Sequence, residues 1–160
     1  SAAASIGSHF LKRKDSVAMV TYGSKMEFLP ADSGDKQQYK VLSRLASVTP
    51  SGSMPLQAVT NSLAPRISRG SPVFIISSLE GDGTTLPAIR NLSGNGHEVI
   101  VLSPSSVDLE RLVSRIPRMA YEVLKLERQN RLTAVSGYGA KVIDWMPEVE
   151  LSQALMQSRG

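Results

Sequence analysis

The sequence contains no cysteine, which excludes disulfide scaffolds, thiolate zinc sites and cysteine nucleophiles. Only 5% of its residues are aromatic, and its net charge of +4 is spread along the chain. Nucleic-acid-binding domains concentrate basic residues and often interleave aromatic ones, so we expect no nucleic-acid partner. No apolar run approaches the roughly twenty residues of a membrane span, and no signal peptide is visible. We therefore expect a cytoplasmic location and no membrane contact by this chain.

The length of 160 residues corresponds to one domain. We expect a single domain over residues 1–160. Because the sequence begins at Ser1 without a methionine, we also expect it to be an excised part of a longer protein.

The most continuously apolar stretch, residues 71–80, reads SPVFIISSLE. Its run of four apolar residues shows no alternation, which is typical of a strand buried on both faces of a parallel sheet. A polar turn with Ser77, Ser78, Glu80 and Asp82 follows it. In open α/β sheets, ligands and partners bind at the carboxyl ends of the strands. We therefore expect any function of the chain to lie at this edge.

Four further strands are predicted at residues 15–22, 26–29, 98–102 and 140–145, the first two forming a hairpin. Apolar spacing predicts helices over residues 2–11, 35–48, 55–67, 84–92, 107–116 and 119–135, and a C-terminal amphipathic helix around Leu151, Ala154 and Leu155. Strand, helix and strand in this order imply parallel crossovers. The sequence therefore predicts a three-layer α/β/α, Rossmann-like fold with about five strands, mostly parallel, and an antiparallel hairpin at one edge.

The helix over residues 119–135 carries both apolar and charged positions. We expect its core stripe to be Ala120, Val123, Leu124, Leu132 and Val135. We expect its solvated face to be Glu122, Lys125, Glu127, Arg128 and Arg131.

Several segments in this order resemble a von Willebrand factor A-like domain: DSVAMVTYG at 15–23, GSMPL at 52–56, VFIISSL at 73–79 and GHEVIVLSP at 96–104. With LER at 126–128 and GAKVIDW at 139–145, the chain is more narrowly similar to the domain of unknown function family 58. That family consists of prokaryotic proteins often linked with MoxR-type ATPases. The similarity covers nearly the whole chain, and it implies a protein partner, for which a MoxR-type ATPase is the candidate.

The resemblance also implies a metal-ion-dependent adhesion site, and there the sequence departs from the family pattern. The family's Asp-x-Ser-x-Ser motif would precede Ala2 and is absent, its loop Thr is Met54, and its Asp after the apolar strand is Ser78. Mg²⁺ and Ca²⁺ need six or more oxygen ligands, and a thioether is a poor substitute. We expect a degenerate or incomplete site without a bound metal or other cofactor, in which Ser78 and Asp82 are the remaining candidate metal ligands.

In the family, the strand that carries the absent motif lies between the strands that correspond to residues 17–21 and 73–76. Unpaired buried strand edges are costly and adhesive. We therefore expect an altered sheet, or a homodimer formed through the exposed strand edges.

These considerations favour a non-enzymatic protein–protein interaction module. Its partner-binding candidates lie in the loops expected at the carboxyl edge of the sheet: Ser24, Ser51, Ser53, Met54, Ser77, Ser78, Glu80 and Asp82. One alternative is a small α/β hydrolase or nucleotide-handling enzyme that uses the turn from Ser77 to Asp82. Another is an inert scaffold part of a membrane-anchored parent protein.

We expect no catalytic residue. His97 precedes its strand, which places it at the opposite edge from Ser77 and Ser78, and His9 lies beside Phe10 on the first helix. No serine stands in a Gly-x-Ser-x-Gly elbow. Asp144, inside the last strand, is expected to be a hydrogen-bonded structural carboxylate.

Overall fold

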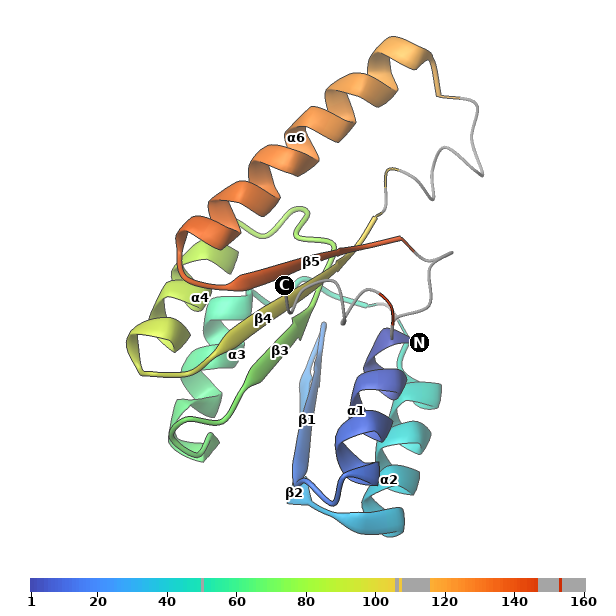
Figure 1. Ribbon diagram of the computed structural model, residues 1–160, viewed down its shortest axis with the longest axis vertical. Coiled ribbons are helices and arrows are strands. Elements are labelled where there is room, and N and C mark those ends of the chain that lie inside the picture. Colours follow the sequence, from blue (N-terminus) through green and yellow to red (C-terminus); the bar gives the residue numbers. More distant parts are fainter. Residues whose placement is uncertain (50, 106, 108–115, 147–152, 154–160) are drawn as a thin grey trace. The chain divides into compact units, whose positions relative to one another are not determined.

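The computed structural model describes residues 1–49, 51–105, 107, 116–146 and 153 (Figure 1). The predicted C-terminal helix and most of the predicted helix over 107–116 lie outside these residues. The chain forms two compact units, Ser1–Met54 and Pro55–Gly160. The described strands form two sheets, one in each unit.

The first unit is a β-hairpin accompanied by two helices (Figure 1). Strands β1 (Val17–Tyr22) and β2 (Met26–Asp32) pair antiparallel. Helices α1 (Ala2–Lys12) and α2 (Gly34–Ser47) pack against each other. The basic residues that end α1 are favourable there because they face the negative end of its dipole.

A buried glutamine fastens α2 to the hairpin. Gln37 is fully buried, and its Nε2 donates hydrogen bonds to the carbonyl oxygens of Val17 at 2.7 Å and Pro30 at 2.9 Å. Val17 begins β1 and Pro30 lies near the end of β2, so one amide group holds the open end of the hairpin. The apolar pattern of the sequence gives no sign of this contact, because glutamine is usually exposed.

The second unit contains a parallel sheet in the order β3–β4–β5. Its strands are β3 (Val73–Ile76), β4 (Val99–Pro104) and β5 (Lys141–Trp145), and its described helices are α3 (Leu56–Leu63), the 3₁₀ turn η1 (Ala64–Arg66), α4 (Thr85–Gly94) and α6 (Arg118–Gly137). Apolar residues from α3, α4, the sheet and the end of α6 form one core: Leu56, Ile75, Leu79, Ala88, Ile89, Leu92, Val99, Val101, Val135 and Ala140. The predicted α/β fold, with a parallel sheet and an antiparallel hairpin, is confirmed.

The assignment of the faces of α6 needs three corrections. Arg128, assigned to the solvated face, is 4% exposed, whereas Ala120 and Val123, assigned to the core stripe, are exposed. Tyr121, Arg128 and Val135 are the buried residues of α6, and they lie seven residues apart on one face. Because Val135 is anchored in the core, Arg128 is held on the same face two turns earlier. An arginine tolerates this position because its long apolar stem packs while its charged group reaches past the core.

Candidate functional site

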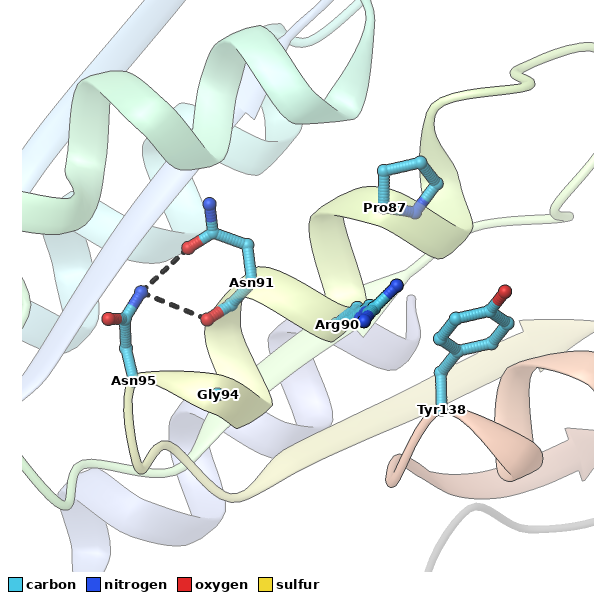
Figure 2. Close-up of a pocket in the computed structure, with 6 residues that line it drawn as sticks. All are labelled: Pro87, Arg90, Asn91, Gly94, Asn95 and Tyr138. Carbon is cyan, nitrogen blue, oxygen red and sulfur yellow. Dashed lines mark hydrogen bonds between the residues drawn. The ribbon is translucent and has the colours of Figure 1, made fainter.

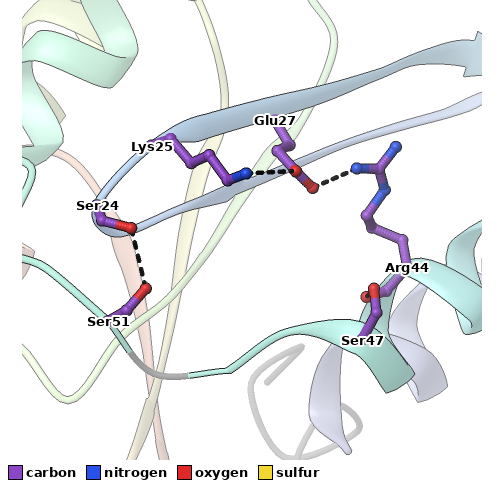
Figure 3. A network of polar contacts seen from close by, with 6 residues as sticks. All are labelled: Ser24, Lys25, Glu27, Arg44, Ser47 and Ser51. Carbon is purple, nitrogen blue, oxygen red and sulfur yellow. Dashed lines mark hydrogen bonds and ion pairs between the residues drawn. The ribbon is translucent and has the colours of Figure 1, made fainter.

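Two of the predicted partner loops meet in the first unit. The Met54 N–H donates to the Gly23 carbonyl oxygen at 3.0 Å, and the hydroxyl oxygens of Ser24 and Ser51 are 3.1 Å apart (Figure 3). Ser24, Ser51 and Ser53 are exposed, whereas Met54 is half-buried. The structure therefore brings four of the predicted candidates together at the tip of the hairpin.

This close approach requires glycine in both loops. A Cβ on Gly23 would lie 2.1 Å from the Ser51 carbonyl oxygen. A Cβ on Gly52 would lie 2.3 Å from the Ser24 nitrogen, and Gly52 also has a φ of +73°, which side chains rarely adopt. The loops are thus held against each other by backbone packing.

The charged side chains beside these loops are paired. Glu27 of β2 accepts a hydrogen bond from Arg44 of α2 and lies 3.9 Å from the Lys25 ammonium group (Figure 3). The Ser47 hydroxyl donates to the Arg44 carbonyl oxygen at 2.8 Å. This network ties the hairpin to α2, and Ser24, Lys25 and Ser51 are exposed at the loop tip.

In the second unit, the turn after β3 is shaped by two left-handed residues. Leu79 has a φ of 65° and Gly81 a φ of 73°. The Ser77 hydroxyl oxygen accepts a hydrogen bond from the Leu79 N–H at 3.0 Å, and the Leu79 side chain is buried in the core. The Ser77 hydroxyl therefore serves the turn itself. Ser78 is half-buried and Glu80 is exposed.

Asp82 accepts hydrogen bonds at the starts of two helices. Its Oδ2 accepts from the Leu56 N–H at 2.8 Å, and its Oδ1 accepts from the Thr84 N–H at 2.8 Å and from the Thr84 hydroxyl at 2.6 Å. Burial raises the pKa of Asp82, but the hydrogen bonds from Thr84 and Leu56 outweigh it and leave the pKa below its ordinary 3.8. The Asp82 carboxylate thus links the first turn of α3 to the first turn of α4.

These surroundings do not fit a hard metal ion. Both oxygens of Asp82 are occupied by hydrogen-bond donors, whereas a hard cation needs several free oxygen ligands. Within the described ranges, no three His, Asp or Glu side chains come close enough together to hold a metal ion.

A second polar cluster lies at the carboxyl ends of β4 and β5. The Arg128 Nη2 donates to the Ser103 carbonyl oxygen at 2.9 Å and to Asp144 Oδ1 at 2.6 Å. Ser103 and Asp144 are partners in the parallel register of β4 and β5. Ser103 is fully buried, whereas the Asp144 side chain is 48% exposed.

Arg131 extends this cluster toward β3. Its Nη2 lies 3.8 Å from Oε1 of Glu80, in the turn after β3. The two arginines of α6 therefore contact groups at the ends of all three strands. From the sequence, Glu80 was a candidate and Asp144 a structural carboxylate, but both arginines were assigned to the solvated face of the helix, and so their contacts with the strand ends were missed. The available signal was the spacing of Leu124, Arg128 and Leu132, four residues apart on one helical face.

The histidines lie away from these clusters. His97 is 9% exposed, and its Nδ1 is 3.3 Å from the Ser71 carbonyl oxygen, at the amino end of β4. His9 makes an edge contact with the neighbouring Phe10 ring, their centroids 5.4 Å apart.

A shallow pocket of about 430 Å³ lies at the C-terminal end of α4 (Figure 2). It is lined by Pro87, Arg90, Asn91, Gly94, Asn95 and Tyr138. The Asn95 amide donates to the side-chain and backbone oxygens of Asn91, at 2.6 and 2.9 Å, and so closes the end of the helix. All six lining residues are exposed.

No family model and no curated protein matches the sequence. Two solved structures resemble the chain. An aerotolerance-related membrane protein from Bacteroides fragilis NCTC 9343, with multiple mutations to serine, has a TM-score of 0.51 and 22% identity over 64% of this chain. The conserved hypothetical protein BatB from Bacteroides thetaiotaomicron has a TM-score of 0.64 and 14% identity over 98% of this chain. The matches span 55% and 83% of those two chains.

The fold is von Willebrand factor A-like. At these identities the likeness establishes the fold, and the narrower similarity to the domain of unknown function family 58 stays a prediction. Although one relative is a membrane protein, no helix in the described part of this chain is both long and apolar enough to cross a bilayer.

Proposed function

We propose that this von Willebrand factor A-like chain is a non-enzymatic protein interaction module and that its contact surface is an apolar stripe on α6. The stripe consists of Met119, Val123 and Leu126, which are 85%, 56% and 59% exposed. Their spacing of four and three residues places them on one face of the helix. Single exposed apolar residues are ordinary, but several on one face mark a surface that contacts another protein. This stripe is the observation that carries the proposal.

The proposed partner is a MoxR-type ATPase, because the chain resembles the domain of unknown function family 58, whose members are often linked with such ATPases. Charged residues of both signs flank the stripe: Arg118, Glu122, Lys125 and Glu127. Interfaces typically combine an apolar centre with a polar rim of this kind. The partner surface should therefore be an apolar groove, bordered by charges of both signs, that accepts one face of a helix.

In this proposal the module acts in the cytoplasm and needs no metal or catalytic group. The full occupation of Asp82 by hydrogen-bond donors supports a degenerate adhesion site. The use of the Ser77 hydroxyl within its own turn supports a role without nucleophilic chemistry.

Hydrogen exchange measured by mass spectrometry tests the location of the contact. The ATPase from the same genome should slow exchange in peptides from the first half of α6 and leave α2 unchanged. Protection elsewhere, with α6 unaffected, would contradict the assignment. α2 is a suitable internal control because it also exposes a large side chain, Tyr39, at 74%.

Self-association through strand edges is a second part of the proposal. Among the described strands, β1 pairs with β2 alone and β3 pairs with β4 alone, so β1 and β3 each lie at an edge of their sheet. Sheet edges recruit further strands. Light scattering over a dilution series should show a dimer that dissociates, whereas a monomer at every concentration would contradict this part.

A further inference from the structure

Four buried polar atoms near the carboxyl ends of the second sheet have no hydrogen-bond partner among the residues that the structure describes. They are Nε and Nη1 of Arg128, Nε of Arg131 and Oγ of Ser103. All four can donate a hydrogen bond. Arg128 is 4% exposed and Ser103 is fully buried, so bulk water does not supply the missing partners.

The register of the sheet places Ser103 under Arg128. Val101 of β4 and Val142 of β5 are partners in the register of the sheet. Val101 belongs to the core, which also contains Val135 of α6, and Val142 packs against that core. Ser103 lies two positions after Val101, and Asp144 lies two positions after Val142. The side chains of Ser103 and Asp144 therefore emerge on the same face of the sheet as those two valines. The Ser103 hydroxyl, the Asp144 carboxylate and the Arg128 guanidinium therefore share the space beneath α6.

Structural needs alone do not account for this arrangement. A buried donor without an acceptor costs about 1–3 kcal/mol, and more when it is charged. A Met or Leu at position 128 would cover the sheet without that cost, since position 128 lies on the buried face of α6. The cluster is better explained as a set of donors prepared for an acceptor.

The carboxylates of Asp144 and Glu80 provide acceptors for only part of the donors of Arg128 and Arg131. Asp144 and Glu80 each contact one guanidinium nitrogen, at 2.6 and 3.8 Å. Their side chains are 48% and 42% exposed, so water can solvate either carboxylate when an entering anion takes its place beside the arginine. An entering group with several acceptor oxygens and a negative charge would meet donors from both arginines and the serine.

We propose that Arg128, Arg131 and Ser103 form a binding site for an oxyanion, a carboxylate or phosphate group, at the carboxyl edge of the second sheet. Guanidinium groups pair with both kinds of oxyanion through charge-assisted hydrogen bonds. The site is independent of the apolar stripe, because Arg128 and Met119 are nine residues apart and therefore on opposite faces of α6. A failure of the partner proposal leaves this site untouched.

NMR of the ¹⁵N-labelled chain tests the site through the Nε–H resonance of Arg128 and, in the Arg128→Lys variant, through that of Arg131. Inorganic phosphate and succinate are titrated separately at constant ionic strength. Ser103→Ala removes one donor and leaves both arginines, and Arg128→Lys keeps the charge while it removes the guanidinium. Arg118→Lys, an exposed change on the same helix, is the matched control.

A saturable shift of the Arg128 resonance is expected with at least one of the two anions. A response to phosphate alone identifies a phosphate site, and a response to succinate identifies a carboxylate site. Ser103→Ala should weaken binding about tenfold, Arg128→Lys should abolish it, and Arg118→Lys should leave it unchanged. The proposal is overturned by no saturable shift with either anion, or by equal binding to wild type and Ser103→Ala.

Discussion

Arg128 of α6 holds Asp144 of β5 at 2.6 Å, although the arginine is 4% exposed and the Asp144 side chain is 48% exposed. The pair is therefore unequal. The carboxylate can be solvated by water if it loses its partner, whereas the buried guanidinium cannot. Two of the guanidinium nitrogens already lack an acceptor within the described part of the chain.

This inequality predicts opposite effects of two substitutions. Asp144→Ala should lower the free energy of unfolding by about 2 kcal/mol, because it removes the charged partner of a buried cation. Arg128→Met should leave that free energy within about 1 kcal/mol of wild type or raise it, because the buried donors disappear and an apolar side chain fills their place. Urea unfolding followed by Trp145, the one tryptophan and the neighbour of Asp144, measures both. Equal losses in the two variants would show that the pair is kept for stability.

Asp82 should stabilise the second unit in a pH-dependent way. Asp82→Asn should lower the free energy of unfolding by about 1–2 kcal/mol at neutral pH, because the side chain fastens the starts of α3 and α4. The folded pKa lies below the ordinary 3.8, so this contribution is present above that pH and is lost as the pH falls through the folded pKa.

Urea unfolding at a series of pH values checks this expectation. The gap between wild type and Asp82→Asn should be constant near neutrality and close below about pH 3.8. Glu122→Gln, which changes an exposed carboxylate of α6, serves as the control and should have little effect at any pH. A gap that persists at the lowest pH would refute the role of the ionised carboxylate.

Much of the fold was predictable because each strand and most helices carry a local pattern. The unbroken apolar run of β3 and the Gly23 turn of the hairpin depend on neighbouring residues alone. The roles of Gln37 and Arg128 depend on carbonyl and carboxylate groups distant in sequence. Both residues have polar side chains that are buried on a helix, although glutamine and arginine are usually exposed. Asp82 was placed at the correct turn, but its contact with Leu56 joins segments 26 residues apart and has no local signal.

The glycine pair of the hairpin tip should resist substitution. Gly52→Ala should destabilise the first unit by more than the roughly 1 kcal/mol expected from a left-handed φ alone, because its Cβ would also meet the Ser24 backbone. Gly34→Ala is the matched control, since Gly34 has a φ of +79° but no atom within 4 Å of an added Cβ. Hydrogen exchange of β1 and β2 amides reports the stability of this unit. Equal effects of the two substitutions would show that the contact between the loops is unimportant.

A charged side chain at position 37 should destabilise the first unit. Gln37→Glu places a carboxylate against the carbonyl oxygens of Val17 and Pro30, which donate nothing to it. The change should lower the free energy of unfolding of the first unit by about 3 kcal/mol at neutral pH. Acidification should restore part of the loss, because a protonated carboxyl can donate one hydrogen bond. Gln37→Met, which keeps the size and removes the donors, should cost about 1–2 kcal/mol at every pH. If the stability of Gln37→Glu relative to wild type does not change with pH, the two hydrogen bonds from the Gln37 amide to Val17 and Pro30 are not important for stability.

Calorimetric titration of the chain with the MoxR-type ATPase, in the presence of EDTA, tests the interaction proposal most directly. Wild type should bind without a metal ion, and the variant with Met119→Ser, Val123→Ser and Leu126→Ser should bind at least tenfold more weakly. Tyr39→Ser, which changes a large side chain on α2 whose exposure of 74% lies within the range of the stripe residues, should bind as wild type does. Binding that requires Mg²⁺, or that is unchanged in the triple variant, would contradict a metal-independent module that uses the α6 stripe.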